Sequence, residues 1–267
     1  MTAYVISDSG TMLARSMRRM RRYPSLTLFV AGMPVVLLLL FVYVFGGALG
    51  SGLGVPGGGR DAYVNYIVPG VLVFAVAGAA QGTAISVAMD MTAGIVARFR
   101  TMAIARSAVL AGHVIGAVLQ TLLAIAIVLA VAVVIGFRPT TGPGEWMAAV
   151  GLLTLTAIAI TWVAVALGMS ANSVETASNS PMILILLPFL SSAFVPTQSM
   201  PGPLAWFAEN QPFTPIIETL RGLFFGSPIG NDGLVAVAWC VAITVGAVLW
   251  SLRLYDRDPS RYLTARS

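Results

Sequence analysis

The sequence predicts an all-α membrane protein with six transmembrane helices, and two observations carry this prediction. Hydrophobic residues make up 58% of the 267-residue chain and charged residues only 9%, which gives a mean hydropathy of +0.90. Several apolar runs also reach the roughly 18 to 20 residues that a helix needs to cross a bilayer. Together they exclude an ordinary soluble domain and predict a single membrane domain over residues 1–267.

The six spans are expected at about residues 25–46, 66–89, 108–136, 146–169, 180–197 and 233–252. Each should be helical because a backbone in lipid must satisfy its own hydrogen bonds. The fifth begins at Pro181, carries Pro188 inside and ends at Pro196, so a kinked or partly unwound helix is expected there. Pro34 lies inside the first span. For both spans a packing kink is favoured over a moving hinge.

The distribution of arginine predicts the orientation. With six spans, 12 of the 15 basic residues fall on one side of the membrane: Arg15, Arg18, Arg19, Arg21, Arg22, Arg98, Arg100, Arg106, Arg253, Arg257, Arg261 and Arg266. The other side receives only Arg60, Arg138 and Arg221. The positive-inside rule therefore places both termini and the loop at 90–107 in the cytoplasm.

Residues 7–23 predict an amphipathic helix ahead of the first span. One face carries Leu13, Met17 and Met20, and arginines crowd the opposite face. Such a helix is expected to lie flat on the inner leaflet, in preference to serving as a docking site. The first span has arginines before it and small residues after it, as a signal peptide does. Its apolar core is too long for one, so we expect it to be retained.

The loop at 90–107 predicts a second amphipathic helix. Met91, Ile95, Phe99 and Met102 recur at i, i+4, i+8 and i+11 and form one apolar stripe. This helix either lies in the headgroup layer with its arginines on phosphates or offers a surface to a cytoplasmic partner. The pattern alone favours the lipid surface.

Residues 198–232, between the fifth and sixth spans, are too apolar for a simple tether. Two short helices are expected there, at about 203–209 and 214–225, with Glu218 and Arg221 able to pair at i, i+3. Aromatic residues suit the membrane interface; they are Trp206, Phe207, Phe224 and Phe225. A re-entrant hairpin that caps a pathway from outside and an interfacial aromatic belt both remain open.

Missing residue types exclude several functions. The chain has no lysine, so it cannot form a Walker A site, and any ATP must be used by another chain. Its only histidine, His113, and only cysteine, Cys240, cannot build a metal site or a disulfide. No nucleophile stands with a base, so no catalytic residue is expected, and no bound cofactor. A nucleic-acid partner is not expected because no large folded basic surface is visible.

Polar residues at membrane depth are few. They are Gln81, Gln120, Thr121, Thr154, Thr156 and Thr161. Hydrogen bonding between helices is favoured over contact with a substrate, and Gln81 and Gln120 are the candidates for the latter. The absence of ionisable residues in mid-span disfavours proton or sodium coupling.

Two long motifs resemble those of ABC-2 type permeases, particularly the daunorubicin-resistance exporter group. Residues 90–116 resemble the cytoplasmic motif, with matches at Asp90, Gly94, Arg98, Arg100 and Arg106, although Ala103 stands where proline is common. Residues 191–223 resemble the outer-loop signature, with matches at Phe194, Pro196, Met200, Pro201, Asn210, Gln211, Pro212, Thr214, Pro215 and Arg221.

This resemblance implies a function for both motifs. The loop with Asp90, Gly94, Arg98, Phe99, Arg100 and Arg106 would dock on a separate ATP-binding cassette ATPase subunit, which would hold ATP and Mg²⁺. An extracellular gate would include Pro196, Met200, Pro201, Asn210, Gln211, Pro212, Pro215 and Arg221. Two permease subunits would work together in a bacterial plasma membrane and export hydrophobic small molecules between them. With this resemblance, docking replaces the lipid surface as the favoured role of the loop.

Two alternatives belong to other classes. One is a channel or facilitator that needs no ATPase, but its charged rings and polar pore helices are missing. The other is a membrane scaffold or immunity protein that only binds a partner. A neighbouring gene for a P-loop ATPase would favour the exporter over both.

Reversing both Arg98 and Arg100 to glutamate is expected to weaken ATPase docking, because their charge is proposed to hold the loop against the partner. The amount of ATPase that co-purifies with the chain measures this, and the amount of chain in the membrane fraction controls for insertion. An unchanged complex with full activity would contradict the docking role of these two residues.

Overall fold

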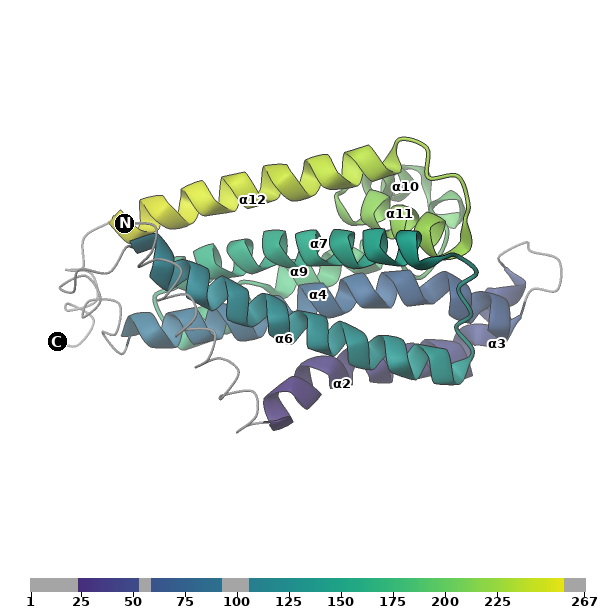
Figure 1. Ribbon diagram of the computed structural model, residues 1–267, viewed down its shortest axis with the longest axis horizontal. Helices are drawn as coiled ribbons and strands as arrows, with labels where there is room; N and C mark the ends of the chain where they lie inside the picture. Colours follow the sequence, from purple (N-terminus) through teal and green to yellow (C-terminus); the bar gives the residue numbers. More distant parts are fainter. Residues whose placement is uncertain (1–23, 53–58, 93–105, 257–267) are drawn as a thin grey trace.

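The all-helical class is confirmed. The computed structural model describes residues 24–52, 59–92 and 106–256, and all regular secondary structure in these ranges is helical. The long helices run side by side as a bundle, with α12 along one flank and α2 along the opposite flank (Figure 1). The interface helix predicted at 7–23 lies outside the described residues.

The first span is one rod with a change of helix type. It comprises α2 (Pro24–Leu40), the π-helical turn η1 (Phe41–Phe45) and α3 (Gly46–Ser51). Pro34 is buried inside α2. The irregular turn begins seven residues later, so the change of helix type does not lie at this proline.

Two central helices carry most of the core. These are α4 (Arg60–Thr92) and α7 (Pro143–Ser170), which pack against each other, and every residue from 67 to 77 of α4 is buried. A helix that is apolar on all sides belongs in such a position. The start of α4 lies six residues before the predicted span, because its polar first turn at Arg60 and Asp61 continues the same helix.

The remaining long helices surround this pair. Helix α6 (Arg106–Ile135) packs on α4, α2 and α7, while α12 (Asp232–Asp256) packs on α7 and α11. The link from α6 to α7 docks on α11: Phe137 meets Phe224 edge-on with ring centroids 5.5 Å apart, and Thr140 N donates to the Phe224 carbonyl at 3.0 Å. We call this end of the bundle the α11 end.

The predicted fifth span is broken, as its prolines indicated. Residues 180–197 contain α9 (Met182–Leu186) and the 3₁₀ turn η2 (Leu187–Leu190), and α8 (Val174–Asn179) lies directly before them. The breaks fall at Pro181 and Pro188, which lack the N–H that a continuous helix needs. The described residues therefore contain five helices long and apolar enough to cross a membrane, and the shorter apolar stretch Val174–Leu190. A sixth span at 180–197 stays a prediction.

The loop between the last two predicted spans contains the two expected short helices. They are α10 (Gly202–Asn210) and α11 (Phe213–Phe225), preceded by the 3₁₀ turn η3 (Thr197–Ser199). Trp206 is 69% exposed, as an interfacial residue would be, but Phe224 is only 1% exposed. The interfacial placement of Phe224 was therefore wrong, because its ring packs against Phe137 and Trp146.

Close packing of α7 on α4 depends on Gly168. A Cβ at this position would lie 2.6 Å from the Ala84 carbonyl oxygen and 3.0 Å from the Val87 Cβ. Gly168→Ala is therefore expected to cost about 1–3 kcal/mol by overpacking. Gly151→Ala on the same helix is the matched control, since nothing lies within 4 Å of its added Cβ. Thermal unfolding in detergent measures both; equal melting temperatures would contradict the close contact.

Candidate functional site

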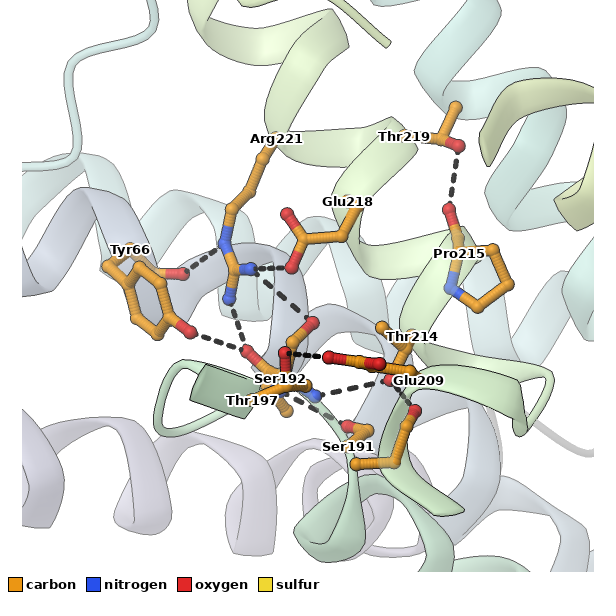
Figure 2. A network of polar contacts seen from close by, with 12 residues as sticks. Tyr66, Ser191, Ser192, Thr197, Glu209, Thr214, Pro215, Glu218, Thr219 and Arg221 are labelled. Carbon is orange, nitrogen blue, oxygen red and sulfur yellow. Dashed lines mark hydrogen bonds and ion pairs between the residues drawn. The ribbon is translucent and has the colours of Figure 1, made fainter. Parts of the chain in front are cut away.

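One charged side chain lies inside the α11 end. Arg221 lies on α11, whose other buried residues are mostly apolar. Only 12% of its side chain is exposed. It contacts Glu218 on its own helix, Tyr66 on α4 and Ser192 in the segment after η2 (Figure 2). We call Tyr66, Ser192, Glu218 and Arg221 the Arg221 cluster.

The guanidinium of Arg221 uses its donors on three different elements. Its Nε donates to the Tyr66 carbonyl at 3.2 Å, and its Nη2 donates to the Ser192 carbonyl at 2.5 Å. Its Nη1 donates to Glu218 Oε1 at 2.5 Å, which confirms the ion pair expected at i, i+3. The Cζ also stacks 3.7 Å from the centroid of the Tyr66 ring. This planar fork with a stacked face is a geometry that lysine cannot reproduce.

The cluster satisfies the backbone of a segment that is not helical. Ser191–Pro196 joins η2 to η3 through turns and contains no regular helix. Its local bonds include Ser191 N to the Pro188 carbonyl at 3.3 Å and Ala193 N to Ser191 Oγ at 3.1 Å. Tyr66 Oη donates to the Ser192 carbonyl at 2.9 Å, and Tyr63 Oη donates to the Phe194 carbonyl at 3.1 Å. From the other side, Thr214 Oγ1 accepts from Ser192 N at 3.3 Å. Side chains of α4 and α11 thus replace the hydrogen bonds that a helix would make.

The same segment lies directly against α4. A Cβ on Gly70 would come 2.6 Å from the Ala193 Cβ and 2.7 Å from its Cα. Only glycine allows this approach without a shift of one chain. Gln211 adds weaker support, because its Nε2 lies 3.4 Å from the Leu190 carbonyl and 3.5 Å from the Leu187 carbonyl.

Few of the predicted gate residues contact this segment. Arg221 does, Pro196 is its last residue, and Gln211 reaches only the η2 carbonyls before it. The other prolines serve as helix boundaries: Pro201 precedes α10, Pro212 precedes α11 and Pro215 lies in the first turn of α11. Asn210 Nδ2 donates to the Trp206 carbonyl of its own helix at 2.7 Å. Met200 lies half-buried between η3 and α10.

Two of the predicted coupling residues lie at the opposite end of the bundle. Asp90 lies near the end of α4 and Arg106 is the first residue of α6. Gly94, Arg98, Phe99 and Arg100 lie outside the described residues, so their role stays a prediction. With a rise of 1.5 Å per residue, the 33 residues of α4 extend about 50 Å from the α11 end to this loop.

The two substrate candidates differ. Gln81 Nε2 donates to the Ser178 carbonyl at 3.1 Å and lies 3.3 Å from Ser178 Oγ, so it joins α4 to α8 as the helix-packing interpretation expected. Gln120 is half-buried on α6. Thr156 also bridges two helices, with its Oγ1 3.6 Å from Cys240 Sγ on α12.

The site is therefore built to hold backbone in place. Within residues 24–52, 59–92 and 106–256, no group of three or more His, Cys, Asp or Glu side chains could hold a metal ion. Tyr63, Tyr66 and Ser192 were not among the predicted site residues. The available signal was a pair of tyrosines at i, i+3 where a long apolar helix begins.

A comparison with known families identifies the chain. Residues 9–225 match the ABC-2 type transporter family. The chain belongs to this family. The matched range includes the Arg221 cluster, the broken fifth segment and the loop between α4 and α6.

Two relatives of this ABC-2 protein are permeases named for drug resistance. It is 30% identical over 255 residues to the daunorubicin resistance ABC transporter permease protein DrrB1 of Streptomyces coeruleorubidus, a match that covers 95% of this chain and 87% of that one. It is 24% identical over 211 residues to the probable doxorubicin resistance ABC transporter permease protein DrrC of Mycobacterium tuberculosis. This match covers 79% of this chain and 76% of that one. The chain is thus an ABC-2 permease of the drug-resistance exporter family.

Replacing Arg221 with alanine is expected to lower the free energy of unfolding by about 2–4 kcal/mol, because the Ser192 carbonyl and Glu218 both lose a charged partner. Arg138→Ala is the matched control at the same end: its Nη1 binds carbonyls of Val133 and Phe137 at an exposed position, so we expect a loss below about 1 kcal/mol. Denaturant unfolding in detergent measures both. Equal losses would show that the cluster contributes nothing beyond an exposed arginine.

Proposed function

We propose that this chain is the transmembrane permease subunit of an ATP-driven exporter for hydrophobic or amphipathic small molecules. The observation that carries this proposal is a match with a daunorubicin resistance permease along 95% of the chain. ATP hydrolysis belongs to a separate ATP-binding cassette subunit, which the family implies. This chain supplies the path and the coupling surface and is not itself an enzyme.

We further propose that the broken segment 174–194 is the fifth of six membrane crossings. Its contacts follow α4 in reverse order. Ser178 meets Gln81, Phe189 lies 5.3 Å from Phe74 between ring centroids, and the Phe194 carbonyl accepts from Tyr63. Positions 81 and 63 are about 27 Å apart along α4, close to the thickness of the hydrocarbon core. A segment of three short helices can therefore cross where packing against α4 protects its breaks.

Six crossings give an orientation in which the α11 end faces outward. Both termini and the loop between α4 and α6 then lie in the cytoplasm, in agreement with the arginine distribution. The ATPase subunit would bind at this loop. The helices α10 and α11 would form the re-entrant, outward-facing cap of the transport path.

The working unit in this proposal pairs two permease subunits with two ATPase subunits. The second permease is either another copy or a relative, and the path lies between them. The names of the relatives suggest daunorubicin and doxorubicin as the first compounds to assay. A lipophilic substrate also fits a chain whose described spans have no charged residue at mid-depth.

Purification of the tagged chain from its native membrane in mild detergent tests this function. We expect mass spectrometry to find a P-loop ATPase in near-equal amount, because the permease lacks its own ATP site. Its absence from a folded, dimeric preparation would contradict the exporter and favour the channel or the scaffold.

A further inference from the structure

One backbone carbonyl of the irregular segment at the α11 end accepts hydrogen bonds from two separate helices. The Ser192 carbonyl accepts from Tyr66 Oη at 2.9 Å and from Arg221 Nη2 at 2.5 Å. Ser192 is only 1% exposed, so water does not compete for this oxygen. In Figure 2 the two donors approach it from different directions, one from α4 and one from α11.

The same residues also join the two helices to each other. Arg221 Nε donates to the Tyr66 carbonyl, and the guanidinium stacks on the Tyr66 ring. The helices α4 and α11 and the segment 191–196 thus form three mutually bonded elements. Moving α4 away from both α11 and the segment 191–196 would break the contacts of Tyr66 with Arg221 and with Ser192 together.

We propose that Tyr66 and Arg221 are positioning residues that hold the transport path closed at the α11 end, and that movement of α4 releases them. This rests on the proposed function, because the movement would begin at the ATPase. Helix α4 runs as one helix from Tyr66 to Thr92, with Pro69 inside it, and its last residues belong to the predicted docking loop at 90–107. A displacement at that loop therefore reaches the Arg221 cluster through one helix.

Separation of α4 from the segment 191–196 requires water to reach the backbone of that segment. When α4 moves away, the Ser192 carbonyl loses Tyr66 and keeps Arg221, whereas the Phe194 carbonyl loses its bond from Tyr63. An unpaired carbonyl in lipid costs several kcal/mol. The released state is therefore stable only where water reaches this segment. Opening of the path and hydration of residue 192 should occur together, which makes residue 192 a reporter.

Labelling of Ser192→Cys in the assembled permease–ATPase complex tests the movement, in a Cys240→Ser background. Cys240 is buried beside Thr156, and the serine replaces its thiol with a hydroxyl that can also hydrogen-bond to Thr156. With a membrane-impermeant maleimide, we expect slow labelling without nucleotide and labelling about tenfold faster with ATP and Mg²⁺, the change that loss of one such hydrogen bond predicts. Ser199→Cys, at an exposed position in the next turn, is the control and should label equally fast in both states.

Conservative variants test Tyr66 and Arg221 while keeping most of each side chain in place. Tyr66→Phe keeps the ring but loses the bond to Ser192, and Arg221→Lys keeps the charge but loses the fork. Each should raise the labelling of Ser192→Cys without ATP by about tenfold and lower the substrate moved per ATP, while ATP hydrolysis and complex yield stay unchanged. Tyr43→Phe, whose residue is exposed, and Arg138→Lys are the matched controls.

The outcomes separate the two proposals. A wild-type complex that hydrolyses ATP but leaves the Ser192→Cys labelling rate unchanged would overturn the positioning role alone. So would variants of Tyr66 and Arg221 that behave as their controls do. A chain that purifies without any ATPase would overturn the exporter and the positioning role with it.

Discussion

The irregular backbone that follows Pro188 imposes the main constraint on this molecule, because it lies among apolar helices and cannot bond to itself as a helix does. Each unpaired carbonyl or N–H in such surroundings costs several kcal/mol. The hydroxyls of Tyr63, Tyr66 and Thr214 and the guanidinium of Arg221 meet this cost. The polar residues of an otherwise apolar region are therefore placed by the needs of one short segment.

Local signals predicted much of the architecture. Hydropathy located the long helices, and the prolines at 181 and 188 indicated where the fifth segment breaks. Helices α10 and α11 and the pairing of Glu218 with Arg221 also followed from spacing along the chain. These features depend on residues a few positions apart, which is the range over which propensity and side-chain pairing act.

Features that depend on distant residues escaped prediction. Tyr66 and Ser192 are 126 positions apart, and nothing local marks either as the partner of the other. The burial of Phe224 likewise depends on Phe137, which reaches α11 only because the α6–α7 link docks there. The prolines signalled a break at the fifth segment but not that the pieces would follow α4, since that arrangement depends on the glycine at 70 and on side chains of another helix.

The π-helical turn at Phe41–Phe45 has a consequence for how the first span can vary. Such a turn accommodates one residue more than an α-turn, and one residue corresponds to about 100° of rotation around the axis. Beyond it, α3 must present Gly50 to Gly59, where a Cβ would lie within 2.1 Å of the carbonyl oxygen. Deletion of one residue within this turn would convert it to an α-turn and leave α3 facing the start of α4 as it does now.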